Sequence, residues 1–345
     1  MCDKTLLIEP LFYFNREGEM LYSEIVATGS GIPEKIVPND FFNYLVEDAN
    51  EWILSRTGIK ERRFAADDQA TSDLATEAAR NALSSCGMDP AELDCLIVAT
   101  STPDMVLPAT ATMVQKNIGA INAYAFDMNS VCSSLVFGMD TADSLIKSGK
   151  CKTVMVIGAD TYSRILNFKD KGSCPLFGDG AGAVIFRGTT EHKGIIQTLI
   201  KSDGRGWELI QVPSSGSRKP VTAETIENME NTFFMEGKKV FIFATDIIPK
   251  IIEDVTSKAG IKPADLDFII PHQANLRIID HITKKTGIER EKFLLNLDRF
   301  GNTAAASVGL VLDENRRNGT IKPGNLVLIM GFGGGLSWGG ILVRA

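Results

Sequence analysis

Short apolar runs alternate along the whole chain with longer segments in which apolar residues recur at helical spacing. In the first half this pattern predicts strands at 22–28, 93–99, 124–127 and 154–158, and helices at 72–86, 109–118 and 132–147. Such an alternation is typical of a β-sheet that is covered by helices on its faces. The sequence therefore predicts an α/β fold.

The clearest helix of the second half is expected at 238–259. Its apolar positions form one stripe that we expect to lie in the core: Val240, Phe241, Ala244, Ile247, Ile248, Ile251, Ile252 and Val255. Residues 202–231 are richer in Gly, Ser, Pro and charged residues. This composition predicts an irregular connection between the halves rather than a further domain.

The chain contains an internal repeat at an offset of 173 residues. The segment SSCGMDPAELDCLI at 84–97 matches SKAGIKPADLDFII at 257–270. The same offset aligns three polar pairs: Asn129 with Asn302, Ser134 with Ser307 and Asp140 with Asp313. Chance similarity can give one such match, but several at one offset indicate a duplicated unit. We expect one half at 20–190 and the other at 191–345.

Composition and charge narrow the class of protein. The 345 residues are 44% hydrophobic and 23% charged, which excludes intrinsic disorder, collagen-like repeats and coiled coils. A net charge of −7 gives no general attraction to nucleic acid or to an anionic membrane, and no apolar run is long enough to span a bilayer. We expect a soluble protein with no nucleic-acid or membrane partner.

The start of the chain and the cysteines indicate a compartment. Glu9 and Pro10 interrupt the first apolar segment and no small-residue cleavage site follows, so we expect no signal peptide. The six cysteines have neither a CxxC pair nor the spacing of metal ligands. We therefore expect a reducing cytoplasm, no metal and no other cofactor.

Three polar residues lie next to predicted strands or helices, near the strand ends at which α/β proteins usually have their functional sites. Cys132 follows the apolar run 123–128 and opens a helical pattern, and the N-terminus of a helix lowers the pKa of a thiol. His272 directly follows the strand expected at 266–270, and Asn302 precedes the helix that the repeat equates with the Cys132 helix. Packing of the halves face to face would bring Cys132 and Asn302 to one pocket. A buried apolar cysteine, a core histidine and an N-cap asparagine are the structural alternatives.

The remaining candidates are two histidines and two glycine clusters. His192 and His281 have polar neighbours, so we expect them on the surface. The clusters GDGAGA at 178–183 and GFGGG at 331–335 lack the strand, turn and helix context of a dinucleotide site. We interpret them as places of close backbone approach, with backbone donors for an oxyanion at 331–335; turns and packing are the alternatives.

Six segments, taken in order, carry a family resemblance: EWILSRTGIKERR, FDMNSVCSS, FGDGAGAVIF, PHQANLRII, DRFGNTAAASVGLVL and IKPGNLVLIMGFGGGLSWGGILVR. The chain resembles beta-ketoacyl-acyl-carrier-protein synthase III, a family of thiolase-fold condensing enzymes that starts fatty acid synthesis. The similarity begins at about Met20 and leaves residues 1–19 as an N-terminal extension outside it. It implies a five-layer αβαβα sandwich of two similar halves, and a homodimer.

The resemblance also implies a reaction. An acyl-CoA primer and malonyl-acyl-carrier protein would give 3-oxoacyl-acyl-carrier protein, CO2 and CoA in a decarboxylative Claisen condensation, with no cofactor beyond these substrates. Cys132 matches the family's nucleophile, and His272 and Asn302 match the pair that binds the malonyl thioester and supports decarboxylation. The backbone N–H groups of Cys132 and Gly334 match the oxyanion donors.

Further positions match the family's substrate contacts. They are Trp52, Arg56, Lys171 and Asn275 for CoA, Arg277, Lys284 and Lys285 for docking of the carrier protein, and Leu107 for the acyl pocket. Lys171 stands where the family has arginine, and NSVCSSL differs from the commonest AAACAG-type surroundings of the nucleophile. A surface helix would equally explain Trp52 and Arg56, and a solvated helix face would explain the two lysines.

The same residues also allow other functions to be compared with this one. A related condensing enzyme that uses a longer, branched or dicarboxylic primer for a specialised product is the nearest alternative. A thiolase would need a second cysteine near the C-terminal glycines, and an elongating synthase would have histidine in place of Asn302. A Cys/His/Asn hydrolase would not show the 173-residue repeat, and a non-catalytic binding module would be expected to lack one of the three catalytic residues.

Overall fold

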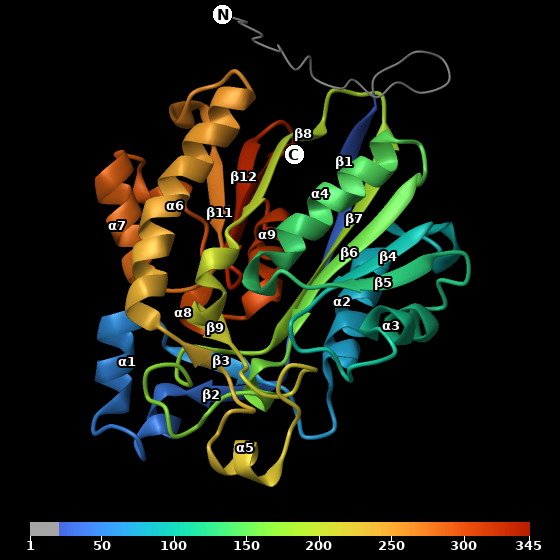
Figure 1. Cartoon of the computed structure of the whole chain (residues 1–345). Coiled ribbons are helices and arrows are strands. Elements are labelled where there is room, and N and C mark those ends of the chain that lie inside the picture. The colour runs from blue at the N-terminus through green and yellow to red at the C-terminus, as the bar shows by residue number, and fades with distance from the viewer. Residues whose placement is uncertain (1–20) are drawn as a thin grey trace, which may run out of the picture.

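Two β-sheets form the centre of the computed structural model, which describes residues 21–345 (Figure 1). In spatial order, the first sheet contains β1 (Tyr22–Gly31), β7 (Gly180–Thr189), β6 (Thr153–Asp160), β4 (Cys95–Ala99) and β5 (Tyr124–Met128). The second contains β11 (Phe268–Pro271), β12 (Leu326–Gly333), β13 (Ser337–Arg344) and β8 (Gly194–Ser202). The strand β4 pairs in parallel with β5 and β6, and β11 pairs in parallel with β12. Both sheets are therefore mixed, with antiparallel strands on one side.

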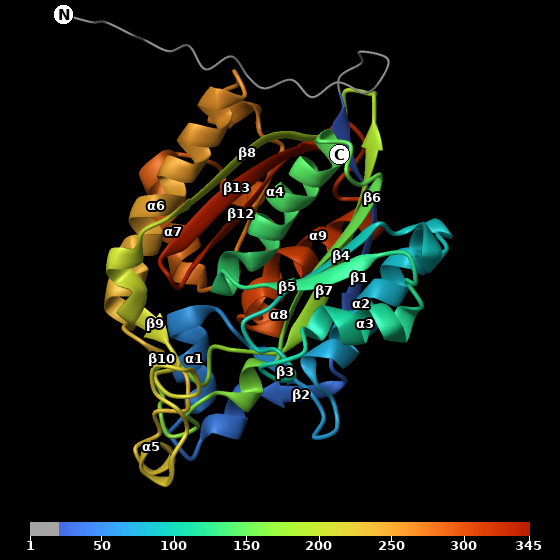
Figure 2. The ribbon, with the colours of Figure 1, turned by 45° about the vertical axis from the view of Figure 1, so that its right-hand side comes forward.

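Helices cover both faces of each sheet (Figures 1 and 2). The helices α4 (Ser134–Lys147) and α9 (Ser307–Arg317) lie between the sheets. The outer face of the first sheet carries α2 (Thr71–Cys86) and α3 (Thr110–Ile118), and that of the second carries α6 (Gly237–Lys258) and α7 (Leu276–Thr286). Every residue of β4 and β6 is buried, as expected for strands with helices on both sides. The prediction of a five-layer αβαβα sandwich is confirmed.

The 173-residue offset relates elements of the two sheets. It carries β6 onto β12 and the 3-10 helix η3 (Val131–Ser133) onto η8 (Ala304–Ala306), with agreement at both ends of each element. It also carries the start of α4 onto the start of α9. The boundary expected between residues 190 and 191 falls in the connection between β7 and β8. The extension at 1–19 lies outside the described residues.

The helix expected from residue 132 begins two residues later than predicted. Val131 has a left-handed φ of 51°, which an α-helix cannot contain. The Ser134 hydroxyl then accepts a hydrogen bond from the Ser130 N–H and donates one to the Val131 carbonyl, both at 2.7 Å. Because this side chain closes the turn, the segment at Cys132 is a short 3-10 helix and α4 starts at Ser134.

The segment 202–231 is largely irregular, as predicted, but it contains short elements: η5 (Gly204–Leu209), β9 (Ile210–Gln211) and α5 (Ala223–Glu227). The strand β9 pairs with β10 (Phe234–Met235). Other short elements are β2 (Lys35–Pro38), η1 (Asn39–Phe42), α1 (Ala49–Thr57), β3 (Glu61–Phe64), η2 (Pro90–Glu92), η4 (Tyr162–Arg164), η6 (Pro263–Asp265), η7 (Arg290–Lys292) and α8 (Leu297–Phe300). Within residues 21–345, no helix has the length and apolar character needed to cross a membrane.

The apolar stripe of α6 is buried over most of its length. Ala244, Ile247, Ile248, Ile251, Ile252 and Val255 pack in the core against the second sheet. Val240 and Phe241, near the start of α6, are only half-buried and line a cavity. The expectation that all eight positions belong to the core is therefore wrong for Val240, whereas Phe241 packs against the core and also lines the cavity described below.

Candidate active site

Cys132 lies in the sharp turn between β5 and α4, at the N-terminal end of the helical segment. Its side chain is 7% exposed. Burial and the negative charge of Asp160 raise the pKa of the Cys132 thiol. This direction is opposite to the lowered pKa that the sequence predicted from the helix N-terminus, because the thiol is buried. A raised pKa favours the thiol over the thiolate at neutral pH.

The glycine cluster at 331–335 brings backbone against the nucleophile. A Cβ atom at Gly333 would lie 2.9 Å from the Cys132 Cβ and 3.1 Å from the Cys132 nitrogen, so only glycine fits there. Ser337 ties this hairpin to the turn: its hydroxyl lies 2.7 Å from the Ser133 hydroxyl and donates to the Gly334 carbonyl at 2.7 Å. The end of β12 therefore forms one wall around Cys132.

His272 directly follows β11 and is held from two sides. Its backbone N–H donates to the Met330 carbonyl at 2.8 Å, and its Nδ1 lies 2.7 Å from the Ser307 hydroxyl oxygen. Burial lowers the pKa of His272 to about 3, so the ring is neutral at physiological pH. When the Ser307 hydroxyl donates to Nδ1, the ring carries its proton on Nε2 and presents an N–H donor.

Asn302 is fixed through its backbone and through its side-chain oxygen. Its N–H donates to the Leu176 carbonyl at 2.8 Å, and its carbonyl accepts from the Gly178 N–H at 3.0 Å. The side-chain Oδ1 accepts from the Ala304 N–H at 2.9 Å. The Oδ1 atom therefore has the role of a turn residue, which was the structural alternative for Asn302. The Nδ2 group is left as a donor on a residue that lines the cavity.

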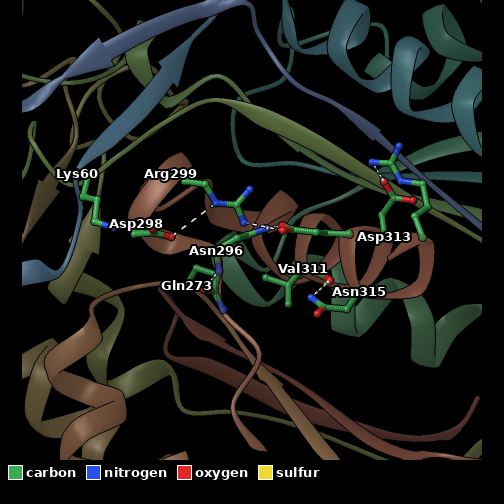
Figure 3. Close-up of polar contacts among 10 residues, drawn as sticks. Lys60, Gln273, Asn296, Asp298, Arg299, Val311, Asp313 and Asn315 are labelled. Carbon is green, nitrogen blue, oxygen red and sulfur yellow. Dashed lines mark hydrogen bonds and ion pairs between the residues drawn. The ribbon is translucent and has the colours of Figure 1, made fainter. Parts of the chain in front are cut away.

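A polar network holds the segments next to His272 and Asn302 (Figure 3). Its contacts are Asn296 N–H to Gln273 Oε1 at 3.2 Å, Asn296 Nδ2 to Glu314 at 3.1 Å, Arg299 to Glu314 at 2.6 Å and Lys60 to Asp298 at 3.2 Å. Gln273 is the neighbour of His272, and α8 leads directly into Asn302. The network therefore links the two segments that carry these side chains.

A cavity of about 450 Å³ opens beside Asn302. Six residues predicted from the sequence line it: Trp52, Arg56, Lys171, Asn275, Arg277 and Asn302. The Arg56 guanidinium lies over the Trp52 indole, with its carbon 4.6 Å from the ring centroid. The cavity thus combines an aromatic face and three cations with an amide donor, which suits an extended anionic ligand that carries a planar group.

The other predicted residues do not line this cavity. Gly334 lies in the turn between β12 and β13, close to Val131. Lys284 and Lys285 are exposed in the last turn of α7, and the Lys285 ammonium lies 3.2 Å from an Asp246 carboxylate oxygen. Leu107 is 78% exposed on the loop between β4 and α3. The chain on its own therefore does not bring Leu107 to the nucleophile.

Sequence reasoning missed two buried polar groups beside the site. Asp160, at the end of β6, is 0% exposed and accepts a hydrogen bond from the Ala305 N–H at 2.9 Å. Ser307 holds the imidazole of His272. The repeat gave a signal for Ser307, which it aligns with Ser134 next to the nucleophile. No signal was available for Asp160, because its partner in the Asn302 segment is far away in the sequence.

His192 and His281 are exposed, as predicted. In the part of the chain that the structure describes, no group of three or more His, Cys, Asp or Glu side chains is placed to hold a metal ion.

Comparison with known proteins adds a family to this geometry. Two family models match, "3-Oxoacyl-[acyl-carrier-protein (ACP)] synthase III" at residues 126–204 and its C-terminal counterpart at 256–345. A beta-ketoacyl-[acyl-carrier-protein] synthase III of Caldanaerobacter subterraneus is 45% identical over 94% of this chain and 98% of its own length.

Solved structures with the same type of name are similar over their whole length. The 3-oxoacyl-[acyl-carrier-protein] synthase III of Aquifex aeolicus is 38% identical with a TM-score of 0.86, over 94% of this chain and 100% of its own. That of Pseudomonas aeruginosa is 34% identical with a TM-score of 0.86, over 94% and 98%.

Proposed function

The chain belongs to the beta-ketoacyl-acyl-carrier-protein synthase III family, and from this premise we propose that Cys132, His272 and Asn302 carry out its chemistry. The protein is an acyltransferase that starts fatty acid synthesis by condensing an acyl-CoA primer with malonyl-acyl-carrier protein. The residue assignment rests mainly on the position of Asn302. It lines a cavity that is also lined by the indole of Trp52 and by three cations, Arg56, Lys171 and Arg277.

In the first half-reaction, the Cys132 sulfur attacks the thioester carbonyl of acyl-CoA. The carbon–sulfur bond to CoA breaks, and the thiol proton leaves with the CoA sulfur. The helix N-terminus behind Cys132 stabilises the negative charge as it forms on the attacking sulfur. The N–H groups of Cys132 and Gly334 hold the oxyanion of the tetrahedral intermediate.

In the second half-reaction, His272 and Asn302 bind the thioester carbonyl of malonyl-acyl-carrier protein. A neutral imidazole N–H and an amide N–H donate to this oxygen, so they stabilise the enolate that forms when CO2 leaves with its bonding electrons left behind. The resulting carbanion attacks the acyl group on Cys132, and the cysteine sulfur leaves. Because the donors are protein groups, we propose that no metal or other cofactor takes part.

The assignment is tested by separating the two half-reactions. Cys132→Ala should slow acyl transfer from acetyl-CoA at least about a thousandfold, because it removes the nucleophile. His272→Ala and Asn302→Ala should still form the acyl-enzyme but lose CO2 release from malonyl-acyl-carrier protein. Intact-protein mass measures the first step and released CO2 the second. A Cys132→Ala variant that still gains the acyl mass would refute the nucleophile.

The primer is a separate question, and Lys171 is the observation that keeps a second candidate function open. Lys171 lines the same cavity as Trp52 and Arg56, but its ammonium lacks the planar group that stacks on an adenine. A related condensing enzyme that takes a longer, branched or dicarboxylic primer is therefore the alternative. Labelling of Cys132 by a panel of acyl-CoAs distinguishes the two: preference for acetyl-CoA supports ordinary initiation, and preference for another donor supports the alternative.

We propose that the protein acts as a homodimer through the edge of its first sheet. Within residues 21–345, the strand β5 has a neighbour on one side only, and Tyr124 on it is 41% exposed. The loop after β4 exposes Val106 and Leu107 to 88% and 78%. An exposed strand edge beside apolar side chains is typical of an association surface. Leu107 would then help close the acyl pocket of the partner subunit rather than its own.

The carrier protein is proposed to dock at the entrance of the cavity. Arg277 lines the cavity, and Lys284 and Lys285 are exposed further along α7. Cations on an otherwise acidic protein suit an acidic carrier. We also propose a cytoplasmic location, which fits the five free cysteines of the described residues.

A further inference from the structure

Asp160 is a buried carboxylate that joins the two halves beside the site. One oxygen, Oδ1, accepts five hydrogen bonds of 2.8–3.1 Å from the backbone and hydroxyl groups of residues 100–102. The other oxygen, Oδ2, accepts from the Ala305 N–H at 2.9 Å. The first set anchors the carboxylate in the first half, and the single remaining bond reaches the turn that follows Asn302 in the second half.

The repeat explains why this bond is informative. We call residues 129–134 the Cys elbow and residues 302–307 the Asn elbow, because the 173-residue offset superimposes the two segments. The offset places Ala305 where the Cys elbow has Cys132, and Asp160 where β12 has Gly333. At the Cys elbow a glycine lies beside the Cys132 nitrogen, and no hydrogen bond from this N–H to another residue occurs among the described residues. At the Asn elbow the equivalent N–H is taken by a carboxylate.

The Ala305 N–H is adjacent to the contact that orients Asn302. The Ala304 N–H donates to the Asn302 Oδ1 at 2.9 Å, which fixes the orientation of the side-chain amide of a residue that lines the cavity. Ala304 has a left-handed φ of 46°, a conformation that costs free energy for a residue with a Cβ atom. The bond from the Ala305 N–H to Asp160 is a contact from outside the turn that helps to hold the chain in this conformation.

We propose that Asp160 is a positioning residue for decarboxylation: by holding the Ala305 N–H, it fixes the Asn elbow and with it the direction of the Asn302 amide. The inference rests on the proposed role of His272 and Asn302 in that half-reaction. It assigns to Asp160 no contact with the substrate. The Cys elbow has no hydrogen bond to the carboxylate, so Asp160 acts on acylation only through its charge, which raises the pKa of the Cys132 thiol.

Asp160→Asn tests the proposal with almost no change in volume. An amide has one acceptor oxygen, so facing it toward the five donors at residues 100–102 leaves its NH2 group against the Ala305 N–H. We expect CO2 release from malonyl-acyl-carrier protein to fall about 10- to 100-fold, because a small displacement of a positioned group has an effect of this size. Loss of the Asp160 charge lowers the pKa of the Cys132 thiol, so acylation of Cys132 by acetyl-CoA should be no slower than in the wild type.

A matched control is Asp313→Asn. Asp313 is also 0% exposed and bonds to Thr28, Ser30 and Arg317, none of which belongs to either elbow. This variant should destabilise the protein without separating the half-reactions. Equal slowing of both half-reactions in Asp160→Asn, or an unchanged rate of CO2 release, would overturn the proposal.

Two further variants keep the result interpretable. If Asp160→Asn does not fold, Ser101→Ala removes one of the six donors, and it should slow CO2 release about threefold while acylation is unchanged. An equal change in both steps would again refute the proposal. His272→Ala reports on the premise: CO2 release at the wild-type rate in this variant would refute the proposed function itself, whereas wild-type release in the Asp160 variant alone would refute only the role of Asp160.

Discussion

The Cys elbow and the Asn elbow have the same backbone but different chemistry. Each contains one residue with a left-handed φ, 51° at Val131 and 46° at Ala304. In each, the N–H of that residue donates to the Oδ1 atom of an asparagine two positions earlier, at 3.0 Å to Asn129 and 2.9 Å to Asn302. Each turn continues into a 3-10 helix and then into a helix between the sheets.

The differences lie in the side chains that surround the two turns. Gly333 leaves the Cys132 N–H open to a substrate oxygen, whereas Asp160 closes the equivalent N–H of Ala305. Asn129 is exposed, whereas Asn302 is buried on the cavity wall. The duplicated turn therefore provides the same rigid backbone in both halves, and it does not by itself determine the chemistry of the residue that it carries. Whether it presents a nucleophile or an amide donor is decided by the side chains that face it from the neighbouring strand.

The largest effect on a reaction rate is expected when a side chain at position 333 fills the space beside Cys132. Gly333→Ala adds a Cβ atom 2.9 Å from the Cys132 Cβ, closer than side chains pack, so Cys132 must move. Acylation by acetyl-CoA, followed by intact-protein mass, should slow about 100-fold. The free energy of unfolding should fall by about 1–3 kcal/mol.

The control for this substitution is Gly216→Ala, where a Cβ atom has no neighbour within 4 Å. It should leave both half-reactions unchanged. Because Gly333 faces the Cys elbow, CO2 release from malonyl-acyl-carrier protein should be much less affected in Gly333→Ala than acylation. Acylation at the wild-type rate in this variant would contradict the importance of the open N–H.

A smaller effect is expected from pH, because the halves differ in titratable groups. The offset puts Ala99 in the first half where the second has His272. Since burial lowers the pKa of His272 to about 3, the unfolded chain binds a proton below its ordinary value of about 6.5 while the folded protein does not. The free energy of unfolding should therefore decrease as the pH falls, by about 2 kcal/mol between pH 8 and pH 5.

Urea unfolding at pH 8 and pH 5 measures this loss, and His272→Gln provides the reference. The variant should lose about 2 kcal/mol less than the wild type over the same interval. Identical losses in the two proteins would mean that His272 does not titrate as its burial predicts. CO2 release should have no inflection near pH 6.5, because the ring stays neutral throughout this range.

Much of the fold was predictable from local sequence, and so were the positions of the three proposed catalytic residues in that fold. The 173-residue repeat was readable because both copies kept the same short motif before a central strand. Cys132, His272 and Asn302 follow or precede predicted elements, so their positions came from periodicity and their roles from the family resemblance. The pKa of the thiol was not predictable, because it depends on burial and on Asp160, which reaches the site only after β6 has packed beside the Asn elbow. Val240 was wrongly assigned to the core because periodicity does not distinguish a core from a cavity wall.

The smallest effect is expected from the paired serines at the start of α4 and α9. The Ser134 hydroxyl closes its own turn through bonds to Ser130 and Val131, whereas the equivalent Ser307 hydroxyl lies 2.7 Å from the His272 ring. Loss of one such neutral hydrogen bond has an effect of about 1 kcal/mol, or about fivefold in rate. Ser307→Ala should therefore slow CO2 release about fivefold, because a less constrained ring presents Nε2 less often.

Ser134→Ala is the reciprocal variant. It should slow acylation by a similar factor and leave CO2 release unchanged, because its hydroxyl supports the Cys elbow alone. Single-turnover measurements of both half-reactions in both variants give four rates, and the prediction is that each variant affects a different one. If both variants slow the same step, the two serines do not have separate roles in the two half-reactions, and the prediction is wrong. If each variant slows a different step, the serine at this position of the duplicated turn supports Cys132 in the first half and the proton position of His272 in the second.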